Sequence, residues 1–136
     1  MKIEPYLFFN GCCEEALAFY EKVFDAQRTF LMRYRESPEA PTVPLPPGWA
    51  DKVMHANITI GETQLMASDG LGPELPRFEG FSLSVSMPDA VTAGRVFSAL
   101  EDGGQVQMPI GETFFAPCFG MVTDRFGISW MIIVNP

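Results

Sequence analysis

The chain has 136 residues and carries 9 Lys and Arg against 17 Asp and Glu, which gives a formal net charge of −8. This length predicts one compact domain or two small halves that can bury a core. The acidic balance argues against nucleic acid and anionic membrane surfaces as partners, because both attract clusters of Lys and Arg. The sequence has no apolar run near the ~20 residues that span a bilayer and no signal-peptide pattern at its start, so we expect a cytoplasmic protein.

The first half of the sequence changes from strand-like to helix-like patterns and back. From Glu14 onward, apolar side chains recur at spacings of three and four residues, which predicts an amphipathic helix with an acidic first turn. Residues 54–60 instead alternate apolar and polar side chains, which is typical of a strand with one buried face. Gly61-Glu62 then fits a two-residue hairpin link. The predicted elements are a strand over 3–9, a helix over 14–24, and strands over 29–34, 54–60 and 63–68.

The second half repeats this order of elements with little residue identity. Serines alternate with apolar residues in its first strand, Pro88 begins its helix, and Gly103-Gly104 ends that helix. The predicted elements are a strand over 81–87, a helix over 88–100, and strands over 105–108, 114–123 and 128–134. A linker over 71–77, rich in Gly and Pro, separates a first module over 1–70 from a second over 78–136. We expect the two modules to form one structural domain.

These patterns predict an α+β fold of two tandem βαβββ modules, each with one helix on one face of a curved four-stranded sheet. The opposite faces remain open, and two such faces enclose a cup suited to a small molecule. We expect the cup to be lined by side chains whose strand phase points inward. These are Leu7, Phe9, His55, Asn57, Gln64, Met66, Ser68 and Met131.

His55 is the single histidine of the chain and lies on the polar face of its predicted strand, beside Asn57. An imidazole there has the chemistry of a general base or of a hydrogen-bond donor to a ligand. The alternative is a strand histidine that is simply solvated, since no cup position near it supplies a carboxylate. Both interpretations stay open at this point.

A proline-rich loop follows the second predicted strand. Residues 35–51 contain five prolines, which exclude a helix interior or a ladder strand and predict a long, extended loop. Trp49, with Val43 and Leu45, gives this loop an apolar underside. The loop therefore fits a lid over the cup, with Trp49 as its contact, or an arm that packs on a second subunit, and disorder is a third interpretation.

The three cysteines do not form a disulfide framework, which suits a reducing compartment. Cys12 and Cys13 lie at a helix start, where the dipole can lower a thiol pKa, but we interpret them as packing or surface residues. Cys118 is expected to be a buried structural thiol. Asp124 is expected to stabilise a turn, and Trp130 falls on the helix-facing phase of its strand, which places it in the core.

Five stretches carry a family resemblance, and they span nearly the whole chain. They are residues 5–11, 18–24, 48–49, 52–56 with Met54-His55-Ala56, and 120–130 with the turn Asp124-Arg125-Phe126-Gly127. On these residues the chain resembles the vicinal-oxygen-chelate superfamily of glyoxalases, extradiol dioxygenases and bleomycin-resistance proteins, and most closely its PhnB-like branch. The resemblance implies tandem βαβββ modules and a homodimer.

Metal-dependent members of this superfamily hold a divalent ion with His, Glu or Gln side chains from four strands. The resemblance carries those positions onto Pro5, Met66, Gly80 (or its neighbours Phe81 and Ser82) and Met131. None of these side chains is a ligand for a hard or borderline divalent ion, because such ions need carboxylate, imidazole or thiolate donors. We therefore expect no metal and no other cofactor, and the sequence lacks a Gly-rich turn of the Rossmann type.

The sequence thus favours a metal-independent, homodimeric small-molecule binding protein whose ligand is modest in size and apolar or aromatic. The alternative is an enzyme of the lyase, isomerase or dioxygenase type that works either with a metal or through His55. A purely structural dimerisation module is a third class.

Overall fold

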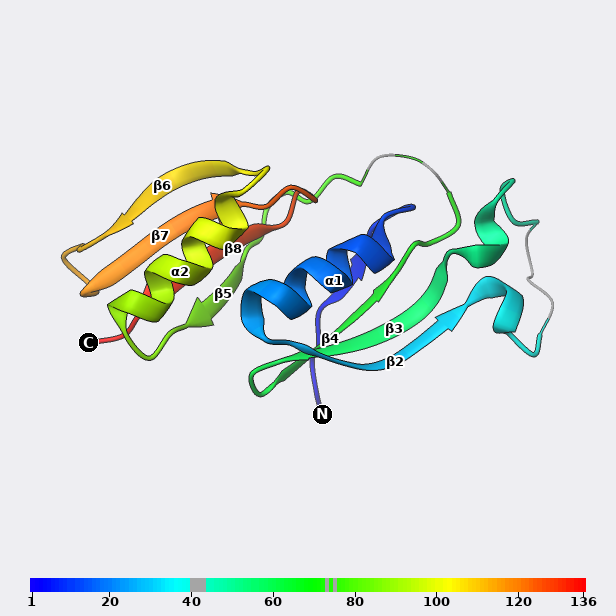
Figure 1. The fold of residues 1–136 in the computed structure, drawn as a ribbon, viewed down its shortest axis with the longest axis horizontal. Helices are drawn as coiled ribbons and strands as arrows, with labels where there is room; N and C mark the ends of the chain where they lie inside the picture. The colour runs from blue at the N-terminus through cyan, green and yellow to red at the C-terminus, as the bar shows by residue number, and fades with distance from the viewer. Residues whose placement is uncertain (40–43, 73, 75) are drawn as a thin grey trace. The chain divides into compact units, whose positions relative to one another are not determined.

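The computed structural model describes residues 1–39, 44–72, 74 and 76–136, in two compact units, Met1–Pro76 and Arg77–Pro136. Each unit contains a four-stranded mixed sheet with one long helix on one of its faces (Figure 1). The tandem βαβββ order predicted from the sequence is therefore confirmed. Within the described residues, neither helix is long and apolar enough to cross a membrane.

The first unit forms a sheet in the order β1-β4-β3-β2, in which β1 runs parallel to β4 and the other pairs are antiparallel. Two short 3-10 helices, η1 and η2, flank the proline-rich loop. The elements are β1 (Tyr6–Phe8), α1 (Cys13–Phe24), β2 (Gln27–Arg33), η1 (Tyr34–Glu36), η2 (Trp49–Asp51), β3 (Val53–Ile60) and β4 (Thr63–Ser68).

The second unit repeats the arrangement with the order β5-β8-β7-β6, and β5 runs parallel to β8. Its elements are β5 (Leu83–Ser86), α2 (Ala90–Glu101), β6 (Gln105–Gly111), β7 (Cys118–Thr123) and β8 (Ser129–Val134). Asp89 caps α2, because its carboxylate accepts a hydrogen bond from the Thr92 N–H at 2.7 Å. Gly120 lets α2 approach the sheet, since a Cβ there would lie 2.7 Å from the Phe97 ring.

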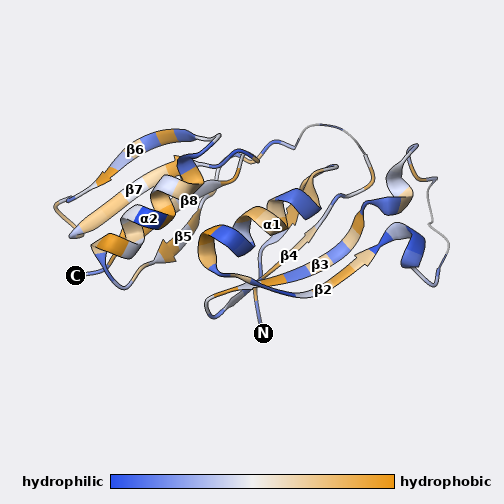
Figure 2. Cartoon of the chain, in the orientation of Figure 1, coloured by the Kyte–Doolittle hydropathy of each residue, from blue (hydrophilic) through white to orange (hydrophobic). Residues whose placement is uncertain are grey.

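Both helices are amphipathic, and hydrophobic and hydrophilic residues alternate around them (Figure 2). Their buried residues lie at helical spacing and pack on the apolar face of the sheet: Cys13, Ala16, Leu17, Tyr20 and Val23 in α1, and Ala93, Val96, Phe97 and Leu100 in α2. The first turn of α1 holds Glu14 and Glu15, which favour the positive end of the helix dipole. Helix α1 ends at Phe24 and is followed by the C-cap residue Asp25, whose φ of 55° is left-handed.

Several predicted strands differ from the observed ones in their bounds, and two of these differences have a clear cause. The strand predicted over 114–123 begins only at Cys118, because Thr113 and Ala116 close a turn through a backbone hydrogen bond of 3.0 Å. The strand predicted over 105–108 continues to Gly111 past Pro109, which the edge position of β6 allows because an edge strand leaves alternate N–H groups unpaired.

Asp69, directly after β4, ties three segments of the first unit together. It is 1% exposed. One carboxylate oxygen accepts the N–H groups of Gly11 and Cys13 at 2.7 and 2.9 Å, and the other accepts the N–H of Val53 at 2.8 Å. The carboxylate therefore joins the end of β4 to the start of α1 and the start of β3.

Replacing Asp69 by Ala should lower the free energy of unfolding by about 3 kcal/mol, because three N–H groups lose their charged acceptor. Urea unfolding measured by circular dichroism checks this. Glu62→Ala, in the exposed turn between β3 and β4, is the control and should change stability by less than about 0.5 kcal/mol. Equal effects of the two substitutions would contradict the role given to Asp69.

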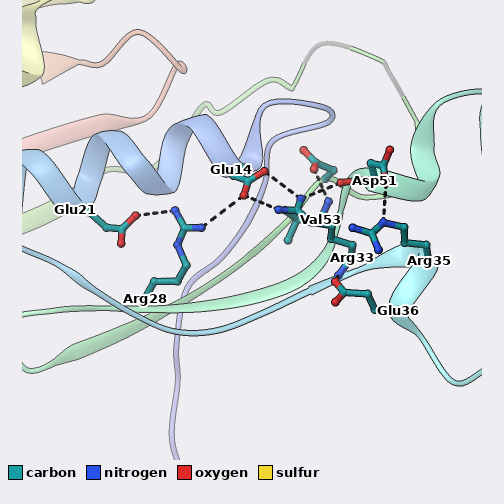
Figure 3. Close-up of polar contacts among 9 residues, drawn as sticks. Glu14, Glu21, Arg28, Arg33, Arg35, Glu36, Asp51 and Val53 are labelled. Carbon is teal, nitrogen blue, oxygen red and sulfur yellow. Dashed lines mark hydrogen bonds and ion pairs between the residues drawn. The ribbon is translucent and has the colours of Figure 1, made fainter.

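Ion pairs join α1 to β2 on the helix side of the first sheet (Figure 3). Glu14 lies between two arginines and meets Arg33 at 2.7 Å and Arg28 at 3.7 Å. Arg28 also forms an ion pair at 2.7 Å with Glu21, which lies further along the same helix. The hydrogen bond from Arg33 holds the pKa of Glu14 below its ordinary value of 4.5. These pairs fix the edge strand β2 against the helix.

Glu14→Gln should lower the urea midpoint slightly at pH 7, and the difference from wild type should fade as the pH falls below the ordinary glutamate pKa of 4.5. The sign follows from the lowered pKa of Glu14: its charge stabilises the fold above the unfolded pKa, and this contribution is lost as the pH falls through the folded one. Glu15→Gln removes a charge from the same helix turn and is the matched control. A pH-independent effect of Glu14→Gln would contradict this assignment.

Candidate functional site

The face of the first sheet opposite α1 carries a group of aromatic and polar side chains, which we call the His55 face. Strand register fixes its members, because residues paired across neighbouring strands project to the same side. Met66 pairs with Tyr6 and with Asn57, Phe30 pairs with Asn57, and Met32 pairs with His55. We use the name for Tyr6, Phe8, Phe30, Met32, His55, Asn57, Gln64 and Met66; Ser68, paired with Phe8, and Thr59, paired with Gln64, lie on the same side of the sheet.

His55 lies half-buried at the centre of this face and uses both ring nitrogens. Its Nε2 lies 3.0 Å from the Asn57 side-chain oxygen, and its Nδ1 lies 3.1 Å from the Tyr6 hydroxyl. An amide oxygen can only accept, so Nε2 carries the hydrogen, and in the neutral ring Nδ1 accepts the Tyr6 O–H. The three side chains therefore form one hydrogen-bonded chain. It runs from Tyr6 on β1 to His55 and Asn57 on β3 and crosses β4, which lies between these two strands.

Aromatic rings extend this polar chain in both directions. The Phe8 and Tyr6 rings stack with centroids 4.7 Å apart, Tyr6 and His55 lie 5.5 Å apart, and His55 and Phe30 lie 6.0 Å apart. Phe8 and Phe30, at the two ends of the row, are 51% and 42% exposed. The row therefore presents apolar surface on either side of the hydrogen-bonded histidine.

A carboxylate lies near the start of β1. Gln64 donates from its amide to Glu4 at 3.4 Å, and Lys2 pairs with the other Glu4 oxygen at 3.3 Å. Because Glu4 is already engaged by both neighbours, it acts in this structure as the partner of Gln64 and Lys2.

The expectation that Leu7 and Phe9 line the cup is wrong in strand phase. Both are buried on the helix side: Leu7 pairs with buried Ala67, and the Phe9 ring lies 6.4 Å from Tyr20 of α1. Tyr6 and Phe8 take the open side instead. Every residue from Tyr6 to Phe9 is large and apolar or aromatic, so the pattern does not show which side chains face the helix. The sequence also held no signal for the Tyr6–His55 contact.

Ser68 and Trp49 have structural roles. Ser68 is 2% exposed, and its hydroxyl accepts the N–H of Gly70 at 3.2 Å. Trp49 is 5% exposed and donates its indole N–H to the Gly70 carbonyl, which also accepts the Tyr34 hydroxyl. Trp49 thus anchors one end of the proline-rich loop. Residues 40–43 of this loop lie outside the described residues, and the lid stays a prediction.

The positions that hold metal in the superfamily do not offer a fitting donor set. In the first unit they are Pro5 and Met66, and the imidazole of His55 has both nitrogens in hydrogen bonds. In the second unit they are Gly80 and Met131. Across the part of the chain that the structure describes, no group of three His, Cys, Asp or Glu residues is placed to hold a metal ion.

Met131 lies on the open face of the second sheet, where it pairs with Ser84 and Met121. Its predicted place in one cup with His55 stays a prediction. Asp124 and Trp130 behave as the sequence indicates, since buried Asp124 accepts from the backbone of its own turn and from the Trp130 indole at 2.8 Å.

Cys12 and Cys13 are not activated nucleophiles. Burial raises the pKa of Cys12 and, more strongly, that of Cys13. The helix dipole therefore does not lower the thiol pKa at this helix start. Cys12 is half-buried and donates to the Phe9 carbonyl, whereas Cys13 and Cys118 are buried.

Iodoacetamide at pH 8 should alkylate Cys12 in the folded protein several times more slowly than in urea, because a raised pKa leaves less thiolate. Cys13 and Cys118 should stay unmodified until urea unfolds the chain. Fragment-ion mass spectrometry of timed samples separates the adjacent thiols. Equal rates for Cys12 in the two states would contradict its assignment as an inert residue.

The chain belongs to a family described as 3-demethylubiquinone-9 3-methyltransferase, whose model matches residues 1–133. It is 33% identical to Protein YjdN of Escherichia coli K12, over 98% of this chain and 95% of that protein. Two solved structures share its fold closely. Protein PA1353 of Pseudomonas aeruginosa is 41% identical, with a TM-score of 0.86 over 99% of this chain and 98% of that one. A PhnB protein of Bacillus cereus is 30% identical, with a TM-score of 0.84 over 99% and 100%.

The wider fold also has a counterpart in a glyoxylase, bleomycin resistance protein and dioxygenase domain from Frankia. That domain is 15% identical, with a TM-score of 0.67 over 100% of this chain and 98% of that one. At this identity the likeness concerns the fold alone. The resemblance to the PhnB-like branch of the glyoxalase and bleomycin-resistance superfamily is therefore confirmed.

Proposed function

We propose that this protein binds a small, flat, apolar or aromatic molecule on the His55 face, without a metal ion. The observation that carries the proposal is the aromatic row itself: two partly exposed phenylalanines flank a hydrogen-bonded histidine on a sheet face that its own helix does not cover. Exposed apolar surface rimmed by polar groups is typical of a ligand site.

The energetic argument concerns Phe8 and Phe30. Covering the exposed part of two aromatic rings removes apolar surface from water, at roughly 25 cal/mol for each Å². Met66 and Met32 add unbranched, polarisable side chains that repack around ligands of different shape. The face therefore supplies affinity mainly through apolar contact.

Orientation comes from the polar chain. Tyr6, His55 and Asn57 hold one another in fixed positions, so a ligand meets preset polar groups between the two rings. Preset partners reduce the entropy lost on binding. Gln64, fixed by Glu4, adds an amide at the edge of the face.

Metal independence is part of the proposal and rests on donor chemistry. A divalent ion at His55 would have to displace Tyr6 or Asn57 to reach a ring nitrogen, and the neighbouring superfamily positions are proline and methionine. The methyltransferase activity in the family description lies outside the proposal, because two mixed sheets with single helices differ from the doubly wound sheet that binds nucleotide-type cofactors.

An enzyme centred on His55 is the second candidate. The Tyr6–His55 hydrogen bond supports it, because a phenol and an imidazole in contact can pass a proton. The partners of His55 are a phenol and an amide and not a carboxylate, which favours binding over base catalysis. Assembly into a homodimer, which the family resemblance implies, belongs to the proposal as well.

Methyl-labelled methionine spectra test the proposal directly. In a screen of planar aromatic fragments, the Met66 and Met32 methyl signals should shift together. Met66→Glu should weaken binding of the best fragment at least about ten-fold, because a carboxylate replaces apolar contact at the centre of the face. His55→Ala should weaken it less, since the apolar row remains.

Met108→Glu is the matched control, because Met108 is an exposed methionine in β6 of the second unit. It should leave affinity unchanged. Metal analysis of protein purified without chelator should find Zn, Ni, Mn and Fe far below one ion per chain. Fragments that shift only methionines of the second unit, or a stoichiometric metal lost in His55→Ala, would contradict the proposal.

A further inference from the structure

We propose that His55 is a positioning residue that decides whether Tyr6 accepts or donates a hydrogen bond toward the ligand. In the neutral state it makes the His55 face selective for aromatic ligands that carry a hydroxyl or N–H donor. This inference rests on the proposed function and adds the ligand class to it. The groups that carry it are the Tyr6 hydroxyl, the His55 imidazole and the Asn57 amide oxygen.

When the His55 ring is neutral, its hydrogen bonds determine what Tyr6 can offer a ligand. Asn57 accepts at Nε2 of His55, so Nδ1 of the neutral ring has a lone pair and no hydrogen. Tyr6 then donates its single O–H to Nδ1, 3.1 Å away. What Tyr6 can offer a ligand in this state is an oxygen lone pair. A ligand with a hydroxyl or N–H satisfies that lone pair, whereas an ether or a carbonyl leaves it without a donor.

Protonation of His55 removes this preference. The imidazolium ring has hydrogen on both nitrogens, so Nδ1 now donates to the Tyr6 oxygen while Nε2 keeps its bond to Asn57. The Tyr6 O–H is released and can donate to a ligand. An acceptor such as an ether oxygen then gains a hydrogen bond from Tyr6 that is absent when His55 is neutral. No covalent step or net movement of heavy atoms is required.

Imidazole is the side chain whose ordinary charge change lies nearest neutrality, and the other groups beside His55 differ from it in this respect. On β2 its neighbours are its register partner Met32 and the Phe30 ring, and on β4 Met66 and Gln64 pair with Asn57 and Thr59 of the same face; none of these four carries a charge. The ionisable groups of β1 and η1 are Tyr6, Tyr34, Arg35 and Glu36, and the pair Lys2 and Glu4 precedes β1. Carboxylates ordinarily titrate near pH 4, and phenols and ammonium groups near pH 10, whereas imidazole titrates near neutrality.

Two probes with the same ring system test the inference. 1-Naphthol carries an O–H donor, and 1-methoxynaphthalene carries only an ether acceptor on the same rings; neither changes charge between pH 5 and pH 7.5. Their dissociation constants are measured by the Met66 methyl shift at both pH values. We expect the ratio of the two constants to change by about five-fold, the worth of one hydrogen bond, with methoxynaphthalene gaining in acid.

The midpoint of this change should coincide with the titration of the His55 ring in nitrogen-15 spectra of the wild type. That signal is unambiguous, because the chain contains one histidine. Tyr6→Phe and His55→Gln should each make the ratio independent of pH. Tyr34→Phe is the matched control, since its hydroxyl donates to the Gly70 carbonyl and not to His55; it should keep the five-fold change.

The outcomes separate the two proposals. If both probes bind and their ratio does not move with pH, the inference is wrong while the proposed function stands. If the ratio moves equally in Tyr6→Phe, Tyr6 is not the responding group and the inference is also wrong. If neither probe shifts Met66 at either pH, the proposed function fails and the inference fails with it. A ratio that follows the His55 titration and flattens in both variants supports the inference.

Discussion

The buried carboxylate of Asp69 is the interaction on which the first unit depends. It gathers the N–H groups of Gly11, Cys13 and Val53, which lie at the start of α1 and of β3. A buried carboxylate is tolerated only when hydrogen bonds compensate its lost hydration, so the three donors and the charge stabilise one another. These bonds fix the start of α1 beside the start of β3 and the end of β4.

The position of the helix decides what the other face can do. With α1 on one side, Leu7, Ala56 and Ala67 become core, and the residues that alternate with them face outward. The outward set contains the histidine together with a phenol, an amide and exposed rings. The alternation that places apolar residues in the core therefore also places these groups on the outer face. The hydrogen bonds of His55 then hold His55, Tyr6 and Asn57 in a fixed geometry.

Prediction from the sequence succeeded where polar and apolar residues alternate strictly. The strand over 63–68 matches β4, and His55 and Asn57 lie on the predicted side, because a slip of one residue would bury them. It failed for β1, where Tyr6, Leu7 and Phe8 are all large and apolar or aromatic. Trp49 was expected at a lid, yet its indole N–H bonds the Gly70 carbonyl, a partner 21 residues away that no local pattern encodes.

The sequence by itself determined the order of elements, the two-module plan and the family, because these depend on local periodicity and on motifs spread along the chain. Only the tertiary structure decided the phase of β1, the partners of Asp69 and the hydrogen bonds of His55. Each of these joins residues that are distant in the chain: Tyr6 and His55 are 49 positions apart, and Gly11 and Asp69 are 58 apart. Such contacts form only when the sheet brings its strands into register, and this is why the histidine was visible in the sequence while its role was not.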